Sequence, residues 1–263
     1  MKIARIEYDH GKTSYAVLKE NGFNLIDGDI FGAYSLTGEI VTANDAKLLS
    51  PVQPKQIVAI GLNYKQHAIE CKMAFPKAPV VFIKTCNTIT DPDTPIMLPK
   101  MAPSCVDYEA ELAIVIGKKV KNISEEEVDD YIFGYTCSND VSARDCQLKQ
   151  DIQWARGKCF DTFAPVGPWI VKGLNGDNLA ISLKLNGKVM QNSNTSDLLF
   201  SCRQLVSYLS QCMTLYPGSI IMTGTPSGVG MGRRPEVYLR DGDAVTVKIE
   251  GIGELTNKVV LEN

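Results

Sequence analysis

The sequence has few histidines and no long apolar run, and both absences exclude whole classes of protein. Only two histidines, His10 and His67, occur in 263 residues, so neither an HExxH site nor a three-histidine zinc site can form. Its longest apolar stretches, at 78–83 and 112–116, are far shorter than the roughly 20 residues of a membrane span. The net charge is −3 and no basic stripe occurs, so we expect no binding to membranes or nucleic acid.

Several other signatures are missing. The chain contains no GxxxxGK[ST] phosphate-binding loop and no GxSxG nucleophile motif, and its glycine-rich segment 228–232 is not GxGxxG. Its eight cysteines form no CxxC pair, which argues against a zinc ribbon or a redox pair. Because residues 1–12 contain no apolar segment typical of a signal peptide, we expect a cytoplasmic protein with reduced, packed cysteines.

The first fifty residues are typical of short β-strands. We predict strands over 2–8, 14–19 and 23–26, with Asn21-Gly22 as a hairpin signal. Pro51 and Pro54 then favour an extended connector. The sequence therefore predicts a small N-terminal β-rich domain, 1–54, packed against a catalytic domain, 55–263.

The remainder of the chain is also dominated by strand patterns. We predict strands over 56–61, 80–84, 112–117, 132–138, 168–172, 181–185, 219–223 and 244–249. Helices are fewer: a short one opened by the capping box at 124–127, and two with helical spacing over 142–155 and 200–212. Because these strands do not alternate regularly with helices, the pattern favours a β-rich α+β fold over a doubly wound sheet.

The segment 107–116 contains the most informative acids. Residues two apart in a strand share a face, so Glu109 and Glu111 point the same way, and Asp107 is a candidate to join them. Two neighbouring carboxylates at the edge of a buried region need a cation or a shared proton. Oxygen ligands suit Mg²⁺, Mn²⁺ or Ca²⁺, while a solvated strand face with two spare acids is the alternative.

Three further clusters supply polar groups. Asp140 is placed as a third ligand or as a helix N-cap, and Arg144 and Gln147 share a helix face that either binds a carboxylate or forms a surface salt bridge. Lys158, between glycine and apolar residues, is expected to be partly buried and to orient or protonate an enolate. The turn 222–230 either binds an anion through backbone amides or is a plain tight turn.

His67 is the one histidine in a motif. Glu70 follows it by one helical turn, and a carboxylate beside an imidazole fixes its tautomer and raises its basicity. We therefore weigh a general base, in which a neutral imidazole takes a proton, against a structural or exposed histidine.

Taken in order, these segments resemble the fumarylacetoacetate hydrolase family, over essentially all of 56–257. The resemblance rests on GLNYKQHAIE (61–70), VDYEAELAIVIGK (106–118), GYTCSNDVSARDCQ (134–147), QWARGKCFDTFAPVGPW (153–169), LNGKVMQ (185–191), MTGTPSGVG (222–230) and DGDAVTVKIEGIGELTN (241–257). It implies a β-rich α+β fold, a mixed β-sandwich roll with a small N-terminal β domain, and a homodimer.

The resemblance also implies roles for single residues. Mg²⁺ or Mn²⁺, one ion per chain, would bind Glu109, Glu111 and Asp140, with Lys158 beside the metal and the substrate. Arg144, Gln147 and Thr225 would contact the substrate, and His67 and Glu70 would lie on a mobile lid, for which we expect residues 64–78. The segments 85–90 and 231–240 depart from the family pattern, so the family does not fix the substrate.

Three function hypotheses follow from the resemblance. The first is C–C bond hydrolysis or decarboxylation of a small 2-oxo acid, as in acylpyruvases and oxaloacetate decarboxylases. The second is isomerisation or decarboxylation of hydroxymuconate-type diacids in aromatic catabolism, or tautomerisation. The third, from another class, is a non-catalytic binding protein, against which the intact acids and Lys158 count.

Overall fold

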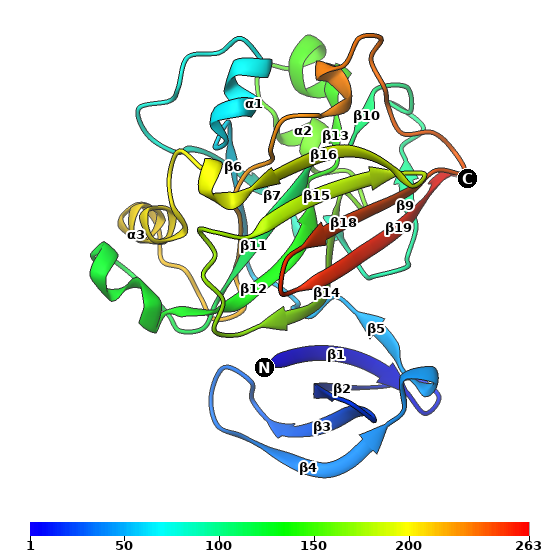
Figure 1. Ribbon diagram of the computed structural model, residues 1–263, viewed down its shortest axis with the longest axis vertical. Helices are drawn as coiled ribbons and strands as arrows, with labels where there is room; N and C mark the ends of the chain where they lie inside the picture. Colours follow the sequence, from blue (N-terminus) through cyan, green and yellow to red (C-terminus); the bar gives the residue numbers. More distant parts are fainter. Residues whose placement is uncertain (263) are drawn as a thin grey trace.

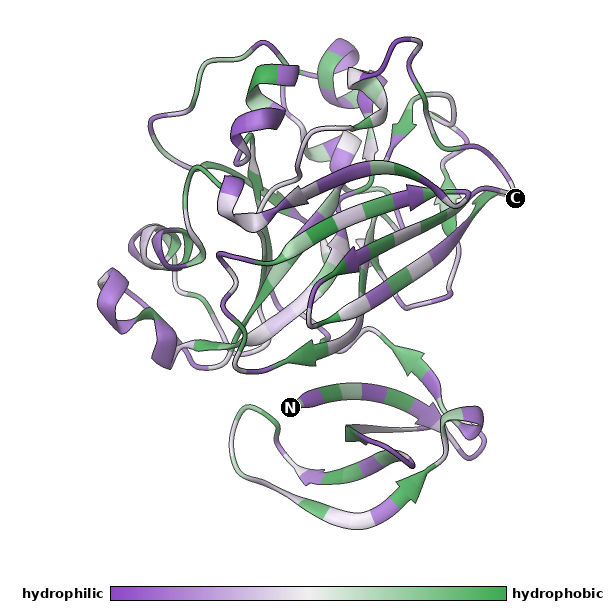
Figure 2. Ribbon diagram, viewed as in Figure 1, coloured by the Kyte–Doolittle hydropathy of each residue, from purple (hydrophilic) through white to green (hydrophobic). Residues whose placement is uncertain are grey.

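The computed structural model describes residues 1–262, which form many strands and few helices (Figure 1). The β-rich α+β class predicted from the sequence is confirmed. The N-terminal strands are β1 (Lys2–Tyr8), β2 (Lys12–Lys19), β3 (Gly22–Gly28), β4 (Tyr34–Val41) and β5 (Lys47–Leu49). Figure 2 shows β1 alternating between hydrophobic and hydrophilic residues, as expected of a strand with one buried face.

The hairpin between β2 and β3 differs by one residue from the sequence expectation. Lys19 pairs with Gly22, so Glu20 and Asn21 form the turn and Gly22 begins β3. Gly22 has φ +136°, and a Cβ there would stand 2.3 Å from the Val41 carbonyl oxygen, so this position requires glycine.

The N-terminal strands continue into the main sheet. β1 pairs with β14 (Ala164–Val171) through Lys2–Val171 and Ile3–Ile170, so the order is β4-β3-β2-β1-β14-β12-β11-β17-β6-β7. The other members are β6 (Ile57–Gly61), β7 (Val80–Lys84), β8 (Ile89–Thr90), β11 (Ala110–Ile116), β12 (Ile132–Asn139) and β17 (Ile220–Met222). The boundary expected at 54/55 falls between β5 and β6 and stays a prediction.

A second sheet packs on the first. Its order is β16 (Lys188–Asn194), β15 (Ala180–Leu185), β18 (Ala244–Ile249), β19 (Gly253–Leu261) and β9 (Ile96–Leu98). β10 (Val106–Asp107) pairs separately with β13 (Ser142–Ala143). Figure 1 shows β15, β16, β18 and β19 side by side in front of β11 and β12.

The core explains why β11 is a continuous apolar run. Leu112 and Ile114 belong to the apolar cluster that contains Leu183 of the second sheet, whereas Val115 belongs to a separate cluster with Ile220. Every residue of β11 is buried, because apolar side chains cover both of its faces. The strand that begins with the candidate metal ligands is therefore firmly held.

The α-helices are α1 (Lys65–Glu70), α2 (Ala155–Lys158) and α3 (Cys202–Cys212). The 3₁₀ helices are Ala43–Asp45, Cys86–Thr88, Glu125–Asp130, Thr195–Asp197 and Gly230–Gly232. The predicted capping box of Ser124 and Glu127 is confirmed, and α3 corresponds to the helix predicted over 200–212.

The single helix predicted over 142–155 is wrong. Ser142 and Ala143 pair with β10 as β13, a π-helical turn covers Cys146–Gln150, and the chain is extended at Asp151 before α2. Pairing with β10 removes the first residues from the helix, and Asp145, not Asp140, caps the turn by accepting the Cys146 amide. The interruption brings α2 close to the π turn, where a Cβ on Gly157 would lie 2.7 Å from the Gln147 nitrogen.

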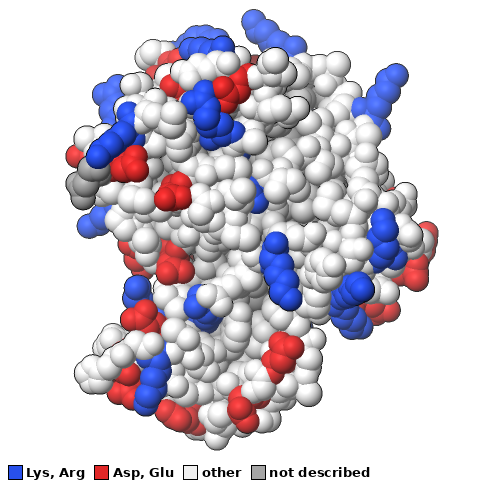
Figure 3. Space-filling view, turned by 180° about the vertical axis from the view of Figure 1, so that it is seen from behind, with Lys and Arg blue, Asp and Glu red and all other residues white. Residues whose placement is uncertain are grey.

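The surface shows no dominant charge on the face drawn in Figure 3, where Lys, Arg, Asp and Glu are interspersed. Within residues 1–262, no helix combines the length and apolar character needed to cross a membrane.

Candidate active site

The paired ends of β11 and β12 bring three carboxylates together. Glu109 directly precedes β11, Glu111 is its second residue, and Asp140 directly follows β12. The Asp140 amide donates to the Glu109 carbonyl at 2.9 Å, which closes this end of the hairpin. One ligand atom from each side chain lies within 4.8 Å of the others, and all three side chains are buried. The shared strand face of Glu109 and Glu111 predicted from the sequence is present.

Three buried cations contact these acids. Lys158, at the end of α2, donates to Glu109 Oε2 at 2.8 Å and to Asp140 Oδ2 at 2.6 Å. Lys84, at the end of β7, donates to Asp140 Oδ1 at 2.6 Å, and Arg144 Nη2 donates to Glu109 Oε1 at 2.6 Å. Both carboxylate oxygens of Asp140 therefore accept hydrogen bonds from lysines. Both carboxylate oxygens of Glu109 accept from Arg144 and Lys158.

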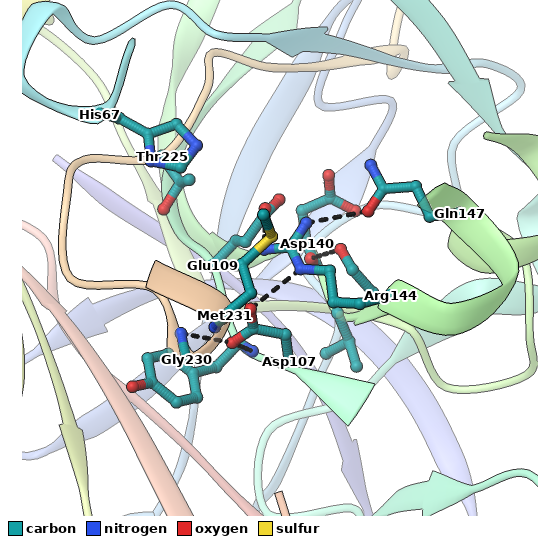
Figure 4. A network of polar contacts seen from close by, with 12 residues as sticks. His67, Asp107, Glu109, Asp140, Arg144, Gln147, Thr225, Gly230 and Met231 are labelled. Atoms are coloured by element: carbon teal, nitrogen blue, oxygen red, sulfur yellow. Dashed lines mark hydrogen bonds and ion pairs between the residues drawn. The ribbon is translucent and has the colours of Figure 1, made fainter. Parts of the chain in front are cut away.

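Asp107 does not join the three carboxylates. It accepts a hydrogen bond from Arg144 Nε at 2.9 Å and from the backbone amides of Gly230 and Met231 at 2.7 and 3.0 Å. Figure 4 shows Arg144 between Asp107 and Gln147. Asp107 therefore fixes the guanidinium and anchors the loop at Gly230–Gly232.

The two glutamates differ sharply in electrostatic environment. Burial disfavours the charge of both, but Arg144 and Lys158 hold the pKa of Glu109 well below its ordinary value. Burial and the charges of Asp140 and Glu109 raise the pKa of Glu111 well above its ordinary value. Its Oε2 accepts the Gly224 amide at 2.9 Å, the one hydrogen bond of this carboxylate within residues 1–262.

This environment suits a divalent cation. Four buried carboxylates, including Asp107, face three buried bases, so the ionised form of Glu111 has no base to balance its charge. Glu111 is the acid without a cationic partner in the described chain, and an ion beside it would remove its repulsion with Asp140 and Glu109. The all-oxygen donor set fits Mg²⁺ or Mn²⁺ and does not fit a thiolate-bound or imidazole-bound metal.

The lysines differ in pKa as well. Although burial disfavours the charge of Lys158, the carboxylates of Asp140 and Glu109 raise its pKa. For Lys84 burial is the stronger effect and lowers the pKa, despite the contact with Asp140. Lys158 is thus held as an ammonium next to the cavity, and its side chain is fully buried rather than partly buried as its neighbours in the sequence predict.

His67 and Glu70 are in contact, as their spacing predicts. Both lie on α1, with His67 Nδ1 and Glu70 Oε2 3.1 Å apart, and Glu70 Oε1 accepts the Gly228 amide at 2.9 Å. Although burial disfavours its charge, contacts with Cys71 and Glu70 raise the pKa of His67 to about 9. The neutral imidazole that a general base requires is therefore the minor form near neutral pH, and the imidazolium is the major form.

A cavity of about 160 Å³ joins these groups. It is lined by all the candidate residues except Glu70, namely His67, Glu109, Glu111, Asp140, Arg144, Gln147, Lys158 and Thr225. Figure 4 shows that His67 and Thr225 lie on one side of Glu109, with Arg144 and Gln147 on the other. Apolar side chains complete the wall, among them Leu62, Phe82, Leu148, Trp154 and Met231.

Sequence reasoning missed Lys84, the anchoring role of Asp107 and the apolar wall. Lys84 ends an otherwise apolar strand, where its side chain is fully buried against an acid 56 residues away. A lysine that closes a strand is usually a solvated residue, so this position carried no local signal. Phe82, two residues before it on the same strand, stacks edge-on with Trp154 at 5.5 Å between ring centroids.

Comparison with known families decides the assignment. The model for the fumarylacetoacetate (FAA) hydrolase C-terminal domain matches residues 56–260, and an "Rv2993c-like, N-terminal" model matches residues 1–51. The chain belongs to the fumarylacetoacetate hydrolase family. The resemblance on which the sequence expectation rests is confirmed.

Relatives in this family carry several names. The chain is 49% identical over 232 residues to a fumarylacetoacetate hydrolase domain-containing protein 2 homolog of Dictyostelium discoideum, covering 83% of this chain and 76% of that protein. It is 45% identical over 226 residues to the mitochondrial oxaloacetate tautomerase fahd2 of Xenopus laevis, covering 84% and 70%.

Solved structures of the family share the fold. A 5-carboxymethyl-2-hydroxymuconate delta-isomerase from Mycobacterium smegmatis superposes with a TM-score of 0.90 at 40% identity, covering all of both chains. A fumarylacetoacetate hydrolase from Exiguobacterium antarcticum gives the same TM-score at 32% identity, again covering all of both chains. The named activities include tautomerisation, isomerisation and hydrolysis, so the family alone does not select one.

Proposed function

We propose that this family member is a Mg²⁺- or Mn²⁺-dependent enzyme that forms and protonates the enolate of a small 2-oxo acid bearing a β-keto or β-carboxyl group. The observation that carries the proposal is a single cavity that contains the three carboxylates, Lys158 and His67. Hard ligands, a fixed ammonium and a proton carrier are the groups that this chemistry needs.

Glu109, Glu111 and Asp140 would hold the ion. When bound, it supplies Lewis-acid stabilisation of the negative charge on the 2-oxo oxygen. With Glu111 ionised, the four acids and three bases carry a net charge of −1, so a bound divalent cation would leave the site positive and therefore suited to an anionic acid.

Polar side chains would then orient the substrate. Gln147 Oε1 accepts from Arg144 Nη1 at 2.9 Å, which leaves the Gln147 amide nitrogen to donate toward the cavity. Thr225 presents its hydroxyl to the same cavity. Phe82, Trp154 and Met231 form an apolar wall that would exclude water from the carbon skeleton.

His67 would move the proton at carbon. In the enol-to-keto direction, the imidazolium gives a proton to C3 while the enol hydroxyl proton leaves O2 for solvent. In the reverse direction neutral His67 would take the proton from C3 while O2 gains one from solvent, and Glu70 holds the imidazole by its Nδ1. Lys158 keeps its proton and stabilises the enolate charge through its ammonium.

The raised pKa of His67 supports protonation of an enolate carbon by the imidazolium, which completes tautomerisation to the keto form or decarboxylation without any proton being taken from water. The oxaloacetate tautomerases among the relatives also favour tautomerisation over C–C bond hydrolysis. The first hypothesis from the sequence paired decarboxylation with C–C bond hydrolysis. Hydrolysis needs His67 to take a proton from water, which only its minor neutral form can do. Isomerisation of hydroxymuconate-type diacids is the second candidate, which the full-length likeness to the isomerase structures supports.

A substrate panel tests the proposal. Oxaloacetate, acylpyruvates and hydroxymuconate-type diacids are incubated with the metal-free protein, then with Mg²⁺ or Mn²⁺, and enol absorbance, released CO₂ and carboxylic acid products are measured. We expect metal-dependent loss of enol absorbance or release of CO₂ with a β-keto acid. No metal-dependent change with any member of the panel would refute the proposal.

A further inference from the structure

Gln191 is a buried amide that links the second sheet to the active site. It lies in β16, the edge strand of that sheet, and only 1% of it is exposed. Its Oε1 accepts the Ala110 amide at 2.9 Å, and its Nε2 donates to Thr225 Oγ1 and to the Pro226 carbonyl, both at 2.8 Å. One end of the amide therefore touches the strand of the candidate metal ligands, and the other touches the turn that contributes Thr225.

The orientation of this amide is fixed by its neighbours. A backbone amide can only donate and a carbonyl can only accept, so Ala110 selects the oxygen of Gln191 and Pro226 selects the nitrogen. If the amide were reversed, its NH₂ group would face the Ala110 N–H and its oxygen would face the Pro226 carbonyl oxygen, and neither pair can form a hydrogen bond. The Gln191 nitrogen must therefore be the atom next to Thr225.

This orientation decides what the Thr225 hydroxyl can do. Since Gln191 Nε2 carries only hydrogens, Thr225 Oγ1 accepts from it, and the hydroxyl hydrogen is left for another partner. Within residues 1–262 this hydroxyl donates to no other group, and Thr225 lines the cavity while being 4% exposed. The preceding residue, Gly224, has φ +102° and donates its amide to Glu111, which ties the turn to β11.

We propose that Gln191 is a positioning residue that makes Thr225 a hydrogen-bond donor toward a carboxylate or 2-oxo oxygen of the bound acid. The inference rests on the proposed function, because it takes an anionic acid as the ligand. Without the Gln191 amide, the Thr225 hydroxyl is free to turn away, for instance to the Pro226 carbonyl that Gln191 now occupies.

A double-mutant cycle tests the coupling through ligand binding rather than turnover. Calorimetry measures oxalate binding at saturating Mg²⁺ for the wild type, Gln191→Leu, Thr225→Val and the double variant. Mg²⁺ binding is measured separately, without oxalate. We expect each single change to weaken oxalate binding by about 10- to 100-fold, the range for a hydrogen bond to a charged group, and the double variant to be no weaker than the weaker single variant.

Three further variants make the result interpretable. Gln191→Glu keeps an acceptor for the Ala110 amide, but its carboxylate accepts the Thr225 hydroxyl hydrogen and so turns it away from the cavity. This variant should therefore lose as much oxalate affinity as Gln191→Leu. It replaces Gln191→Leu in the test if that variant fails to fold. Thr225→Ser keeps the hydroxyl and should retain the wild-type affinity. Gln211→Leu, at an exposed position of α3, is the matched control and should change nothing.

Three results would overturn the inference. The first is a double variant whose fold loss of oxalate affinity equals the product of the two single losses, which would show that Gln191 does not act through Thr225. The second is wild-type oxalate affinity in Gln191→Glu. The third is a loss of oxalate affinity in Thr225→Ser equal to that in Thr225→Val. These results leave the proposed function intact. A wild type that fails to bind oxalate with Mg²⁺ would instead refute the proposed function, and this inference with it.

Discussion

Replacing the two glutamates by glutamine should change the stability of the metal-free protein in different ways. Glu109 is ion-paired with Arg144 at 2.6 Å and Lys158 at 2.8 Å. Glu111 has a backbone amide of Gly224 as its partner and faces the charges of Asp140 and Glu109. The same substitution therefore removes an attraction in one case and a repulsion in the other.

The magnitudes follow from burial. Glu109→Gln leaves two buried cations short of one partner, and breaking a buried ion pair in this way costs about 3–5 kcal/mol of unfolding free energy. At roughly 2–4 °C per kcal/mol for a chain of this size, Tm should fall by roughly 6–20 °C. Glu111→Gln keeps an acceptor for Gly224 and gains an amide donor toward the acids, so stability should be unchanged or higher.

The assay is thermal unfolding with and without metal. With chelator present, the Tm of Glu111→Gln should equal or exceed that of the wild type. The Tm of Glu109→Gln should lie well below that of the wild type. Excess Mg²⁺ should raise the Tm of the wild type by mass action and leave both variants unchanged. Glu125→Gln, at an exposed position of the 3₁₀ helix Glu125–Asp130, is the control. Equal destabilisation by the two site variants in chelator would refute this electrostatic account.

Three other expectations can be checked. His67→Ala should lower turnover by about 10²–10⁴-fold with Mg²⁺ binding unchanged, whereas His10→Ala, in an exposed turn, should change neither; full turnover in His67→Ala would contradict its role as proton carrier. Limited proteolysis within 64–78 should be slowed by oxalate plus Mg²⁺ if this segment is a lid, and unchanged cleavage with confirmed binding would contradict it. Sedimentation at micromolar concentration should show a homodimer, and a 28.8 kDa species alone would contradict that expectation.

The sequence predicts most of the fold and site where a short spacing carries the information. Two-residue spacing on a strand places Glu109 beside Glu111, and three-residue spacing on a helix places His67 beside Glu70. Arg144 also contacts Gln147, although through a π turn and not the regular helix that the spacing suggests.

The remainder depends on contacts between distant segments. Lys84 and Asp140 pair across 56 residues, and Gln191 reaches Thr225 across 34, so neither contact follows from local pattern. The pairing of β1 with β14, which joins the N-terminal strands to the main sheet, could not be predicted for the same reason. Pairing between strands far apart in the sequence depends on the topology of the whole fold.

The most direct test of the central claim is a titration of the metal-free protein with Mg²⁺, following the decay of oxaloacetate enol absorbance. The account predicts no enzymatic decay without metal, activity that saturates as one ion binds per chain, and loss of both binding and activity in Glu109→Gln. Full activity after exhaustive chelation, or in Glu109→Gln, would contradict it.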